Sequence, residues 1–273
     1  MAICQNMRFL KGGLFTYENC FLCPRACGAD RAAGKVGRCG MTNEVKAARI
    51  APHAWEEPIL SGTKGSGTVF FSGCPLQCLY CQNRAISFEK KGEIYTPDAL
   101  CDAFLSLQAQ GCHNINLVTA THFAPTVKET VAKAKEKGLS VPVVWNTSGY
   151  ESEKTLEFLK GTVDVYLTDL RYGKSETARA YSAAPDYPEI AKNALAKMVS
   201  QVGKATLGED GLLKKGVVGR FLLLPEHLLE AKLLLKYAYD TYGEDIYYSL
   251  MSQYTPSPSL PSPLNRTVNE REY

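Results

Sequence analysis

The sequence lacks an excess of charge of either sign, and it lacks a long apolar run. Its 273 residues include 31 Lys and Arg against 28 Asp and Glu, which gives a net charge of +3. This balance argues against nucleic acid or a membrane surface as the main partner. No stretch approaches the ~18 uninterrupted apolar residues of a membrane span, and the first residues, MAICQNMRFLKGG, hold no segment apolar enough for a signal peptide. We therefore expect a cytoplasmic protein.

Cysteine is missing from the whole chain after residue 112, although the sequence has ten cysteines. Eight of the ten precede residue 82. A role in core packing would scatter cysteines more evenly, and a disulfide framework is not expected in a reducing compartment. The clustering therefore favours metal or redox chemistry in the first third of the chain.

The chain from residue 67 onward alternates short apolar runs with amphipathic segments. The apolar runs predict strands at residues 68–71, 115–118, 141–145, 163–167, 217–224 and 246–250. The segments between them predict helices at residues 96–110, 124–137, 152–160, 188–202 and 225–242. This alternation predicts a parallel α/β architecture, wound as an open sheet or as a partial (β/α)6 barrel, because six units are too few for the eight-stranded barrel.

Three parts of the chain differ in composition. Residues 1–66 are rich in Cys, Gly and Arg and are expected to form a small cysteine-rich module, and residues 67–255 form the α/β core. The tail, residues 256–273, begins with PSPSLPSP and should be extended. The capping-box pattern Thr267-Val-Asn-Glu270 then predicts a helix that Tyr273 cuts short, so the tip packs on the body or the chain is truncated.

Three cysteines follow the first predicted strand of the core. Cys74, Cys78 and Cys81 form C-x3-C-x2-C in GCPLQCLYCQN. Thiolates this close can bind one soft metal centre, such as zinc, Cu(I) or an iron–sulfur cluster. A structural zinc or a cubic four-iron cluster normally takes four ligands, and no fourth cysteine or histidine is nearby. An open coordination position is typical of a metal site that does chemistry.

A second set of cysteines lies in the N-terminal module. Cys20, Cys23, Cys27 and Cys39 fit a closed tetrahedral zinc site or a second iron–sulfur cluster. Either metal would order a module that has little apolar core of its own. The spacing does not decide between zinc and iron–sulfur.

The three-cysteine loop, with Tyr80 before the last cysteine, resembles the signature of radical S-adenosylmethionine (AdoMet) enzymes. The longer segment GSGTVFFSGCPLQCLYCQN, together with SLMSQYTP near residue 250, is similar to the branch that contains pyruvate formate-lyase activating enzymes. The resemblance implies a 4Fe-4S cluster on Cys74, Cys78 and Cys81 whose free iron binds AdoMet. It implies reductive cleavage to a 5′-deoxyadenosyl radical, a flavodoxin or ferredoxin-type electron donor and, as one option, a protein substrate such as a glycyl-radical enzyme.

Polar residues follow the predicted strands, and in a parallel sheet the carboxyl ends of the strands form the usual ligand site. Candidate AdoMet-binding residues at these ends are Thr119, Thr121, His122, Asn146, Ser148, Asp169, Arg171 and His227. The segment TDLR resembles DLK of the activating enzymes, which implies that Asp169 and Arg171 hold the methionine part. LLPEH resembles LLPYH, which implies that His227 lies near the ribose or adenine. The Gly-Gly-Glu segment of those enzymes is replaced by ATHFAP.

Two alternatives belong to other functional classes. The first is an iron–sulfur electron carrier, although a carrier needs no six-unit α/β body. The second is a zinc-stapled binding module without catalysis. Neither the substrate nor the oligomeric state can be predicted from the residues.

Overall fold

The computed structural model describes residues 16–257 and 259–272. Nine strands are present in this part of the chain: β1 Val45–His53, β2 Ser66–Phe71, β3 Glu93–Tyr95, β4 Ile115–Val118, β5 Val143–Thr147, β6 Val165–Asp169, β7 Thr206–Leu207, β8 Leu213–Leu222 and β9 Tyr247–Met251. The helices are α1 Pro58–Ser61, α2 Arg84–Ser87, α3 Pro97–Ala109, α4 Ala124–Glu136, α5 Glu153–Phe158, α6 Ser175–Ser182, α7 Tyr187–Val202 and α8 Leu228–Tyr242, with short 3-10 helices η1 Thr121–Phe123 and η2 Gly243–Asp245.

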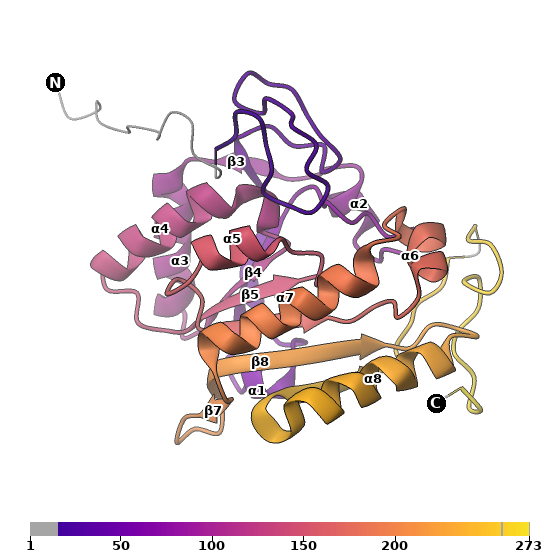
Figure 1. The fold of residues 1–273 in the computed structure, drawn as a ribbon. Helices are drawn as coiled ribbons and strands as arrows, with labels where there is room; N and C mark the ends of the chain where they lie inside the picture. The colour runs from indigo at the N-terminus through magenta and orange to yellow at the C-terminus, as the bar shows by residue number, and fades with distance from the viewer. Residues whose placement is uncertain (1–15, 258, 273) are drawn as a thin grey trace, which may run out of the picture.

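Six strands run parallel in the order β2-β4-β5-β6-β8-β9. They are the six strands expected from the apolar runs, with ends that differ by a few residues. Helices α4, α5, α7 and α8 lie along one face of the sheet (Figure 1). The expected α/β class is therefore confirmed, with an open, mainly parallel sheet consistent with a partial barrel.

Three further strands extend the sheet at its sides. β1 pairs antiparallel with β2, β3 pairs antiparallel with β1, and β7 pairs antiparallel with β8. β1 comes from the region expected to form the cysteine-rich module, so that region contributes one strand to the main sheet. Helix α6 was not expected from the sequence, and α8 begins at Leu228 rather than at residue 225.

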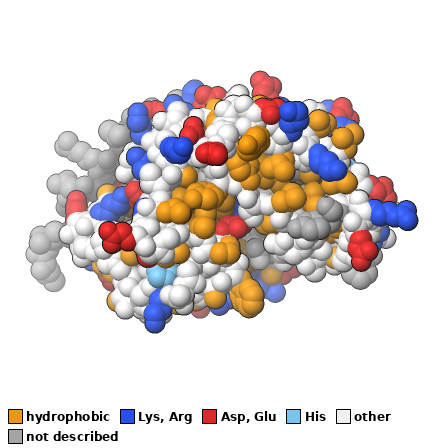
Figure 2. All heavy atoms as spheres, turned by 90° about the horizontal axis from the view of Figure 1, so that it is seen from below, with side chains coloured by type: hydrophobic (Ala, Val, Ile, Leu, Met, Phe, Trp, Pro, Cys, Tyr) orange, Lys and Arg blue, Asp and Glu red, His pale blue; other side chains and the backbone are white. Residues whose placement is uncertain are grey.

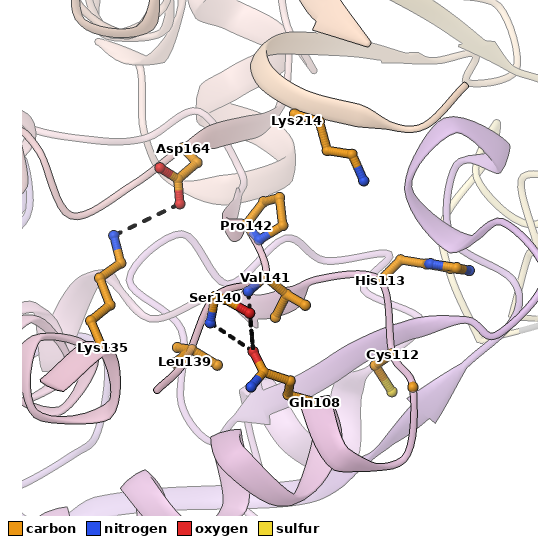
Figure 3. Close-up of a pocket in the computed structure, with 11 residues that line it drawn as sticks. Gln108, Cys112, His113, Lys135, Leu139, Ser140, Val141, Pro142, Asp164 and Lys214 are labelled. Carbon is orange, nitrogen blue, oxygen red and sulfur yellow. Dashed lines mark hydrogen bonds and ion pairs between the residues drawn. The ribbon is translucent and has the colours of Figure 1, made fainter. Parts of the chain in front are cut away.

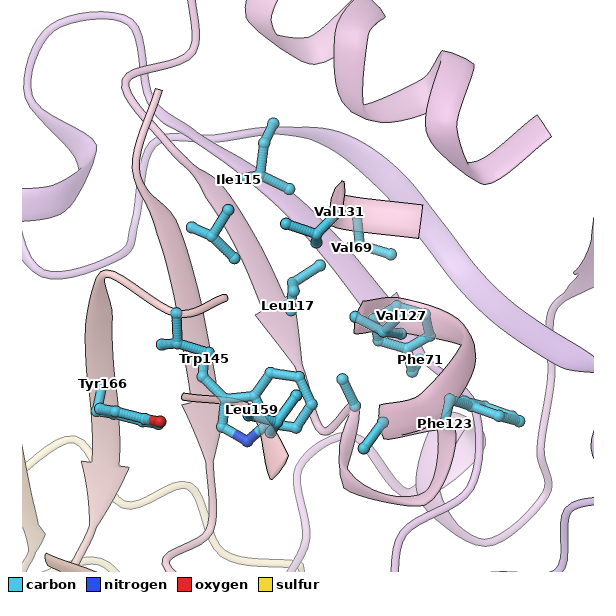
Figure 4. Close-up of a cluster of buried hydrophobic side chains, with 14 of the residues drawn as sticks. Val69, Phe71, Ile115, Leu117, Phe123, Val127, Val131, Trp145, Leu159 and Tyr166 are labelled. Carbon is cyan, nitrogen blue, oxygen red and sulfur yellow. The ribbon is translucent and has the colours of Figure 1, made fainter. Parts of the chain in front are cut away.

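The parallel strands are buried on both faces, as their apolar composition predicts. Leu117, Trp145, Tyr166 and Phe221 belong to the main hydrophobic cluster, which Figure 4 shows in part. On the opposite face, Leu60 of α1 packs in a second cluster with side chains of β5, β6 and β8. Because successive strand residues face opposite sides, the residues next to the main cluster in sequence point to the side of α1.

The tail does not form the helix expected from Thr267. Residues 264–272 form turns. The Asn269 side chain accepts a hydrogen bond from the Arg271 amide at 3.0 Å, and the Glu272 carboxylate accepts from the amides of Asn269 and Glu226 at 3.0 and 2.7 Å. These local bonds to side chains compete with a helical ladder, so the capping-box prediction was wrong.

Within residues 16–257 and 259–272, no helix combines the length and the apolar composition needed to cross a membrane. Apolar side chains nevertheless gather in patches on the face that Figure 2 shows. The exposed large apolar residues of the structure include Leu229, Leu233 and Tyr239 of α8 and Leu250 of β9.

Candidate active site

A cleft of about 300 Å³ lies at the carboxyl ends of the parallel strands. Cys74, Cys78 and Cys81, from the loop after β2, form part of its wall. The other strand ends contribute Thr119, Asn146, Ser148, Asp169, Arg171 and Arg220. The cleft therefore combines three thiols with a carboxylate, two guanidinium groups and neutral hydrogen-bonding groups.

The three-cysteine loop is held in a tight curl. Gly73 and Gln77 have φ values of +80° and +53°, which bend the backbone on both sides of Cys74. Cys74 Sγ accepts a hydrogen bond from the Gln77 amide at 3.5 Å, and Cys81 Sγ accepts one from Ser87 Oγ at 3.2 Å. These bonds turn both sulfurs inward and would stabilise thiolate character at the sulfur atoms.

The three thiols stand close enough to interact electrostatically. Burial raises the pKa of the Cys74 thiol to about 12, and the neighbouring Cys78 and Cys81 raise it further. A metal ligand must be a thiolate, so a metal bound by these residues would release protons. In the described part of the chain, no three Cys, His, Asp or Glu side chains surround one point closely enough to hold a single ion. A cubic cluster instead binds each cysteine to a different iron, and it needs thiols around a cavity, as here.

Two guanidinium groups flank one carboxylate at the floor of the cleft. Asp169 Oδ1 accepts from Arg220 Nε at 2.7 Å, and Asp169 Oδ2 accepts from Arg171 Nη2. Burial would raise the pKa of Asp169, but the two guanidinium groups outweigh burial and hold this pKa below its usual range. The carboxylate is therefore ionised at neutral pH. Arg171 Nε is buried and has no partner among the described residues, which leaves one donor for an anionic ligand.

Glu56, from the loop between β1 and α1, completes the charged network. Its Oε1 accepts from Arg220 Nη1 at 3.2 Å, and its Oε2 accepts from Asn116 Nδ2 and Asn146 Nδ2 at 2.9 and 3.0 Å. Asn146 Oδ1 in turn accepts from Arg220 Nη2 at 2.9 Å. Two acidic and two basic side chains thus balance one another in a largely buried site.

Five of the eight predicted AdoMet-binding residues line the cleft together with the three cysteines. They are Thr119, Asn146, Ser148, Asp169 and Arg171. Asn146, Asp169 and Thr119 lie at or directly after the ends of β5, β6 and β4, as the strand-end argument predicts. Their roles as ligand contacts stay predictions.

Thr121 and His122 do not reach the cleft. The 3-10 helix η1 turns both side chains into the protein, where Thr121 Oγ1 donates to Glu151 Oε1 at 2.6 Å and His122 Nε2 bonds to the Ser72 carbonyl at 2.8 Å. Burial, together with the nearby Arg31, lowers the pKa of His122 to about 3, so the ring is neutral. The structure therefore gives no support for these two residues as ligand contacts.

His227 also lies outside the cleft lining. It bonds through Nε2 to Tyr181 Oη at 2.9 Å and pairs through Nδ1 with Glu230 Oε2 at 3.3 Å. β8 ends at Leu222, so the polar residue of this strand that enters the cleft is Arg220 rather than His227. The side chain of His227 helps instead to join α6 to the start of α8.

The sequence interpretation missed Glu56 and Arg220 as site residues. Arg220 had a recognisable signal, because it is the one charged residue within the apolar run Val217–Leu224, and a buried charge in a strand usually has a specific partner. Glu56 had a weaker signal in HAWEE, because nothing local indicates which sheet position this loop will reach.

The N-terminal cysteines form a second group of thiols. Cys20, Cys23 and Cys39 are buried and Cys27 is exposed. Cys23 lies within electrostatic range of Cys20, Cys27 and Cys39, and burial, ahead of these neighbours, raises its pKa to about 12. The structure thus gathers the four predicted residues, while their metal stays a prediction.

A larger cavity, of about 670 Å³, lies at the other end of the sheet (Figure 3). Its lining residues His113, Pro142, Asp164 and Lys214 lie before or at the starts of β4, β5, β6 and β8. Ligand sites of parallel sheets lie at the opposite, carboxyl ends, so size alone does not make this cavity the active site.

Comparisons with known proteins give one curated relative and several solved structures. The chain is 28% identical over 221 residues to uncharacterized protein MJ0674 of Methanocaldococcus jannaschii; the match covers 78% of this chain and 59% of the relative. The chain therefore spans about three fifths of that relative's length. Among solved structures, anSMEcpe with bound AdoMet is similar with a TM-score of 0.45 and 14% identity, over 74% of this chain and 55% of that one. SuiB of Streptococcus suis has a TM-score of 0.45 and 10% identity, over 74% of this chain and 40% of that one.

The model of one protein family matches residues 68–207, which is just over half of the chain. This segment includes the three-cysteine loop and all the predicted cleft residues except His227, which the structure places elsewhere. It runs from β2 through α7, and so covers four of the six parallel strands. The chain belongs to the radical SAM superfamily.

Proposed function

We propose that this protein cleaves AdoMet reductively and uses the 5′-deoxyadenosyl radical to abstract hydrogen from a substrate. The observation that carries this proposal is one cleft shared by Cys74, Cys78, Cys81 and the Asp169–Arg171 pair. Membership of the radical SAM superfamily supports it. The family implies a 4Fe-4S cluster and AdoMet as cofactors.

The three cysteines would hold the cluster, and the bound cluster supplies the electron that cleaves the sulfonium of AdoMet. Cys78 is buried and Cys74 and Cys81 are half-buried, so the protein shields this position from bulk water. A protected site of this kind limits loss of a reactive radical to solvent.

The charged residues suit the methionine end of AdoMet. Asp169 uses one acceptor position of each oxygen for Arg220 and Arg171, and a carboxylate oxygen can accept again from an ammonium group. The unpartnered Nε of Arg171 can donate to a carboxylate. Arg220 acts through Asp169 and Asn146 as a positioning residue.

The hydroxyl groups suit the ribose. Asn146 is already bonded to Glu56 and Arg220. Among the described residues, no hydrogen bond engages the side chains of Thr119 or Ser148, and both line the cleft. These two hydroxyls are therefore the better candidates for the ribose, with Asn146 acting mainly through its neighbours.

Within this reaction class, we propose activation of a glycyl-radical enzyme as the more specific function, with a flavodoxin or ferredoxin-type electron donor. The presence of the TDLR residues Asp169 and Arg171 in the cleft supports it. The inward turn of Thr121 and His122 speaks against it, because these residues replace the Gly-Gly-Glu segment of the activating enzymes. A small-molecule substrate is the competing option.

Anaerobic reconstitution tests the general proposal. The protein is loaded with iron and sulfide, then given dithionite and AdoMet, and 5′-deoxyadenosine is measured. Wild type and Cys101→Ala, which changes a buried core thiol outside both cysteine sets, should release it. Cys74→Ala should not. An electron carrier would be reduced without cleaving AdoMet, and a zinc-binding module would stay colourless; either result would refute the proposal.

A further inference from the structure

The two loops that carry the cysteine sets pack directly against each other. In Figure 1 the N-terminal loops lie beside α2, which follows the three-cysteine loop. Gln77 Nε2 donates to the Arg38 carbonyl at 2.9 Å, next to Cys39. A Cβ atom at Gly73 would approach the Cys39 carbonyl oxygen to 2.6 Å, so the residue before Cys74 is in backbone contact with the second set.

Arg25 joins the same two loops from another side. It lies between Cys23 and Cys27, and it donates through Nε to the Pro75 carbonyl at 3.0 Å and through Nη2 to the Leu76 carbonyl at 3.3 Å. Both acceptors lie between Cys74 and Cys78. The guanidinium also bonds to the carbonyls of Ser182 and Ala183. A short path of covalent and hydrogen bonds therefore connects Cys23 with Cys74.

Arg31 supplies a buried positive charge at the N-terminal set. Its side chain is fully buried and donates to the carbonyls of Met41, Thr42 and His122. Its Nη1 lies 3.7 Å from Cys20 Sγ, and no carboxylate pairs with it within the described residues. An isolated buried charge is costly, so this position requires a nearby anion. The only groups at the site that can become anionic in number are the four thiols.

We propose that Cys20, Cys23, Cys27 and Cys39 bind an iron–sulfur cluster whose negative charge Arg31 balances and which relays electrons to the three-cysteine site. Four thiolates give such a cluster a net negative charge, which matches the unpaired guanidinium. The direct contact between the loops gives the relay its path. The relay function rests on the proposed AdoMet cleavage, whereas the cluster itself does not.

The electron balance is simple. A one-electron donor, such as a reduced flavodoxin or ferredoxin in the cell or dithionite in the test tube, transfers one electron to the N-terminal centre. That centre passes the electron to the three-cysteine site and returns to its oxidised state. The electron finally enters the sulfonium bond of AdoMet that breaks, and no proton or further reactant is needed for the relay.

The cluster is tested in the full chain with Cys74, Cys78 and Cys81 all replaced by alanine. After anaerobic reconstitution, this variant should keep about four iron and four sulfide per chain, because a second cubic cluster remains. Additional replacement of Cys23 and Cys39 by serine should remove them. Bound zinc without sulfide, or no metal at all, would overturn the proposal. This result is independent of whether the wild type cleaves AdoMet.

The relay is tested by the rate at which a reduced ferredoxin reduces the three-cysteine cluster, followed by stopped-flow absorbance and by electron paramagnetic resonance. Arg25→Gln keeps all seven cysteines, so iron content should be unchanged while reduction slows at least several-fold. Cys101→Ala should match wild type. An equal rate in Arg25→Gln and in a variant lacking Cys20, Cys23, Cys27 and Cys39 would overturn the relay. If those cysteine variants do not fold, Arg25→Gln decides alone, and a wild-type rate overturns the relay.

Discussion

Arg220 on β8 donates through Nε to Asp169 Oδ1 on β6 at 2.7 Å, and the two residues are register partners in adjacent parallel strands. The same guanidinium reaches Glu56 and Asn146. One strand residue therefore links three polar groups of the cleft floor. Its charge also helps to keep Asp169 ionised, which the proposed contact with an ammonium group requires.

Replacing Arg220 by methionine should lower the free energy of unfolding by about 3 kcal/mol, because Asp169 and Glu56 would then keep buried charges without their shared partner. Urea denaturation measures the change. Arg49→Met, which removes an exposed arginine from β1, should change stability by less than about 0.5 kcal/mol. Equal effects of the two variants would contradict the assigned role of Arg220.

Arg171→Gln should weaken AdoMet binding by roughly 10- to 100-fold, the effect of losing a hydrogen bond between charged groups. His227→Ala should change the affinity less than about twofold, because its side chain bonds to Tyr181 and Glu230 outside the cleft. Calorimetric titration of the reconstituted protein with AdoMet compares them. Stronger loss in His227→Ala than in Arg171→Gln would reverse the assignment.

Glu151 should make stability fall as pH rises. Burial raises its pKa, although Thr121, Thr147 and Trp145 donate to Oε1, and Oε2 has no partner in the described part of the chain. The folded state therefore holds a proton that the unfolded state loses near pH 4.3, so this contribution to stability is present below about pH 4.3 and is lost as pH rises towards the raised pKa.

Glu151→Gln should remove that part of the pH dependence, since glutamine cannot ionise. Urea denaturation at several pH values between 4 and 7 gives the slope of unfolding free energy for both proteins. The prediction fails if the wild type and Glu151→Gln show the same slope across this interval.

Gly73→Ala should lower stability by more than about 1 kcal/mol, since alanine is strained at φ +80° and its Cβ would lie 2.4 Å from Met41 Cγ. Gly161→Ala is a matched control, because Gly161 has φ +79° with open space around it. The excess loss in Gly73→Ala measures the contact between the cysteine loops, and both iron content and thermal unfolding should report it. Identical losses would show that the contact contributes nothing.

Much of the site could be predicted from the sequence, because its signals are local. The three cysteines lie within eight residues, and Asn146 and Asp169 end strands whose apolar runs are continuous. A run of this kind predicts a strand buried on both faces, and the connections of a parallel sheet bring all the carboxyl ends to one edge. Proximity of Cys74 and Asp169 follows from these two facts alone.

The remaining site residues depend on where loops turn. η1 begins three residues after β4 and rotates Thr121 and His122 into the core, where Glu151 and Ser72 are their partners. Glu56 reaches the cleft from a loop before the first parallel strand. Such choices depend on partners distant in sequence, which no local pattern reveals.

The sequence by itself determined the six parallel strands, the two cysteine sets and the polar strand ends, because residue period and spacing act over a few residues. Only the tertiary structure decided that Arg220 rather than His227 completes the cleft, and that Arg25 and Gly73 hold the cysteine loops together. The physical reason is that side-chain burial and loop–loop packing are settled between segments far apart in the chain, after the local elements have formed.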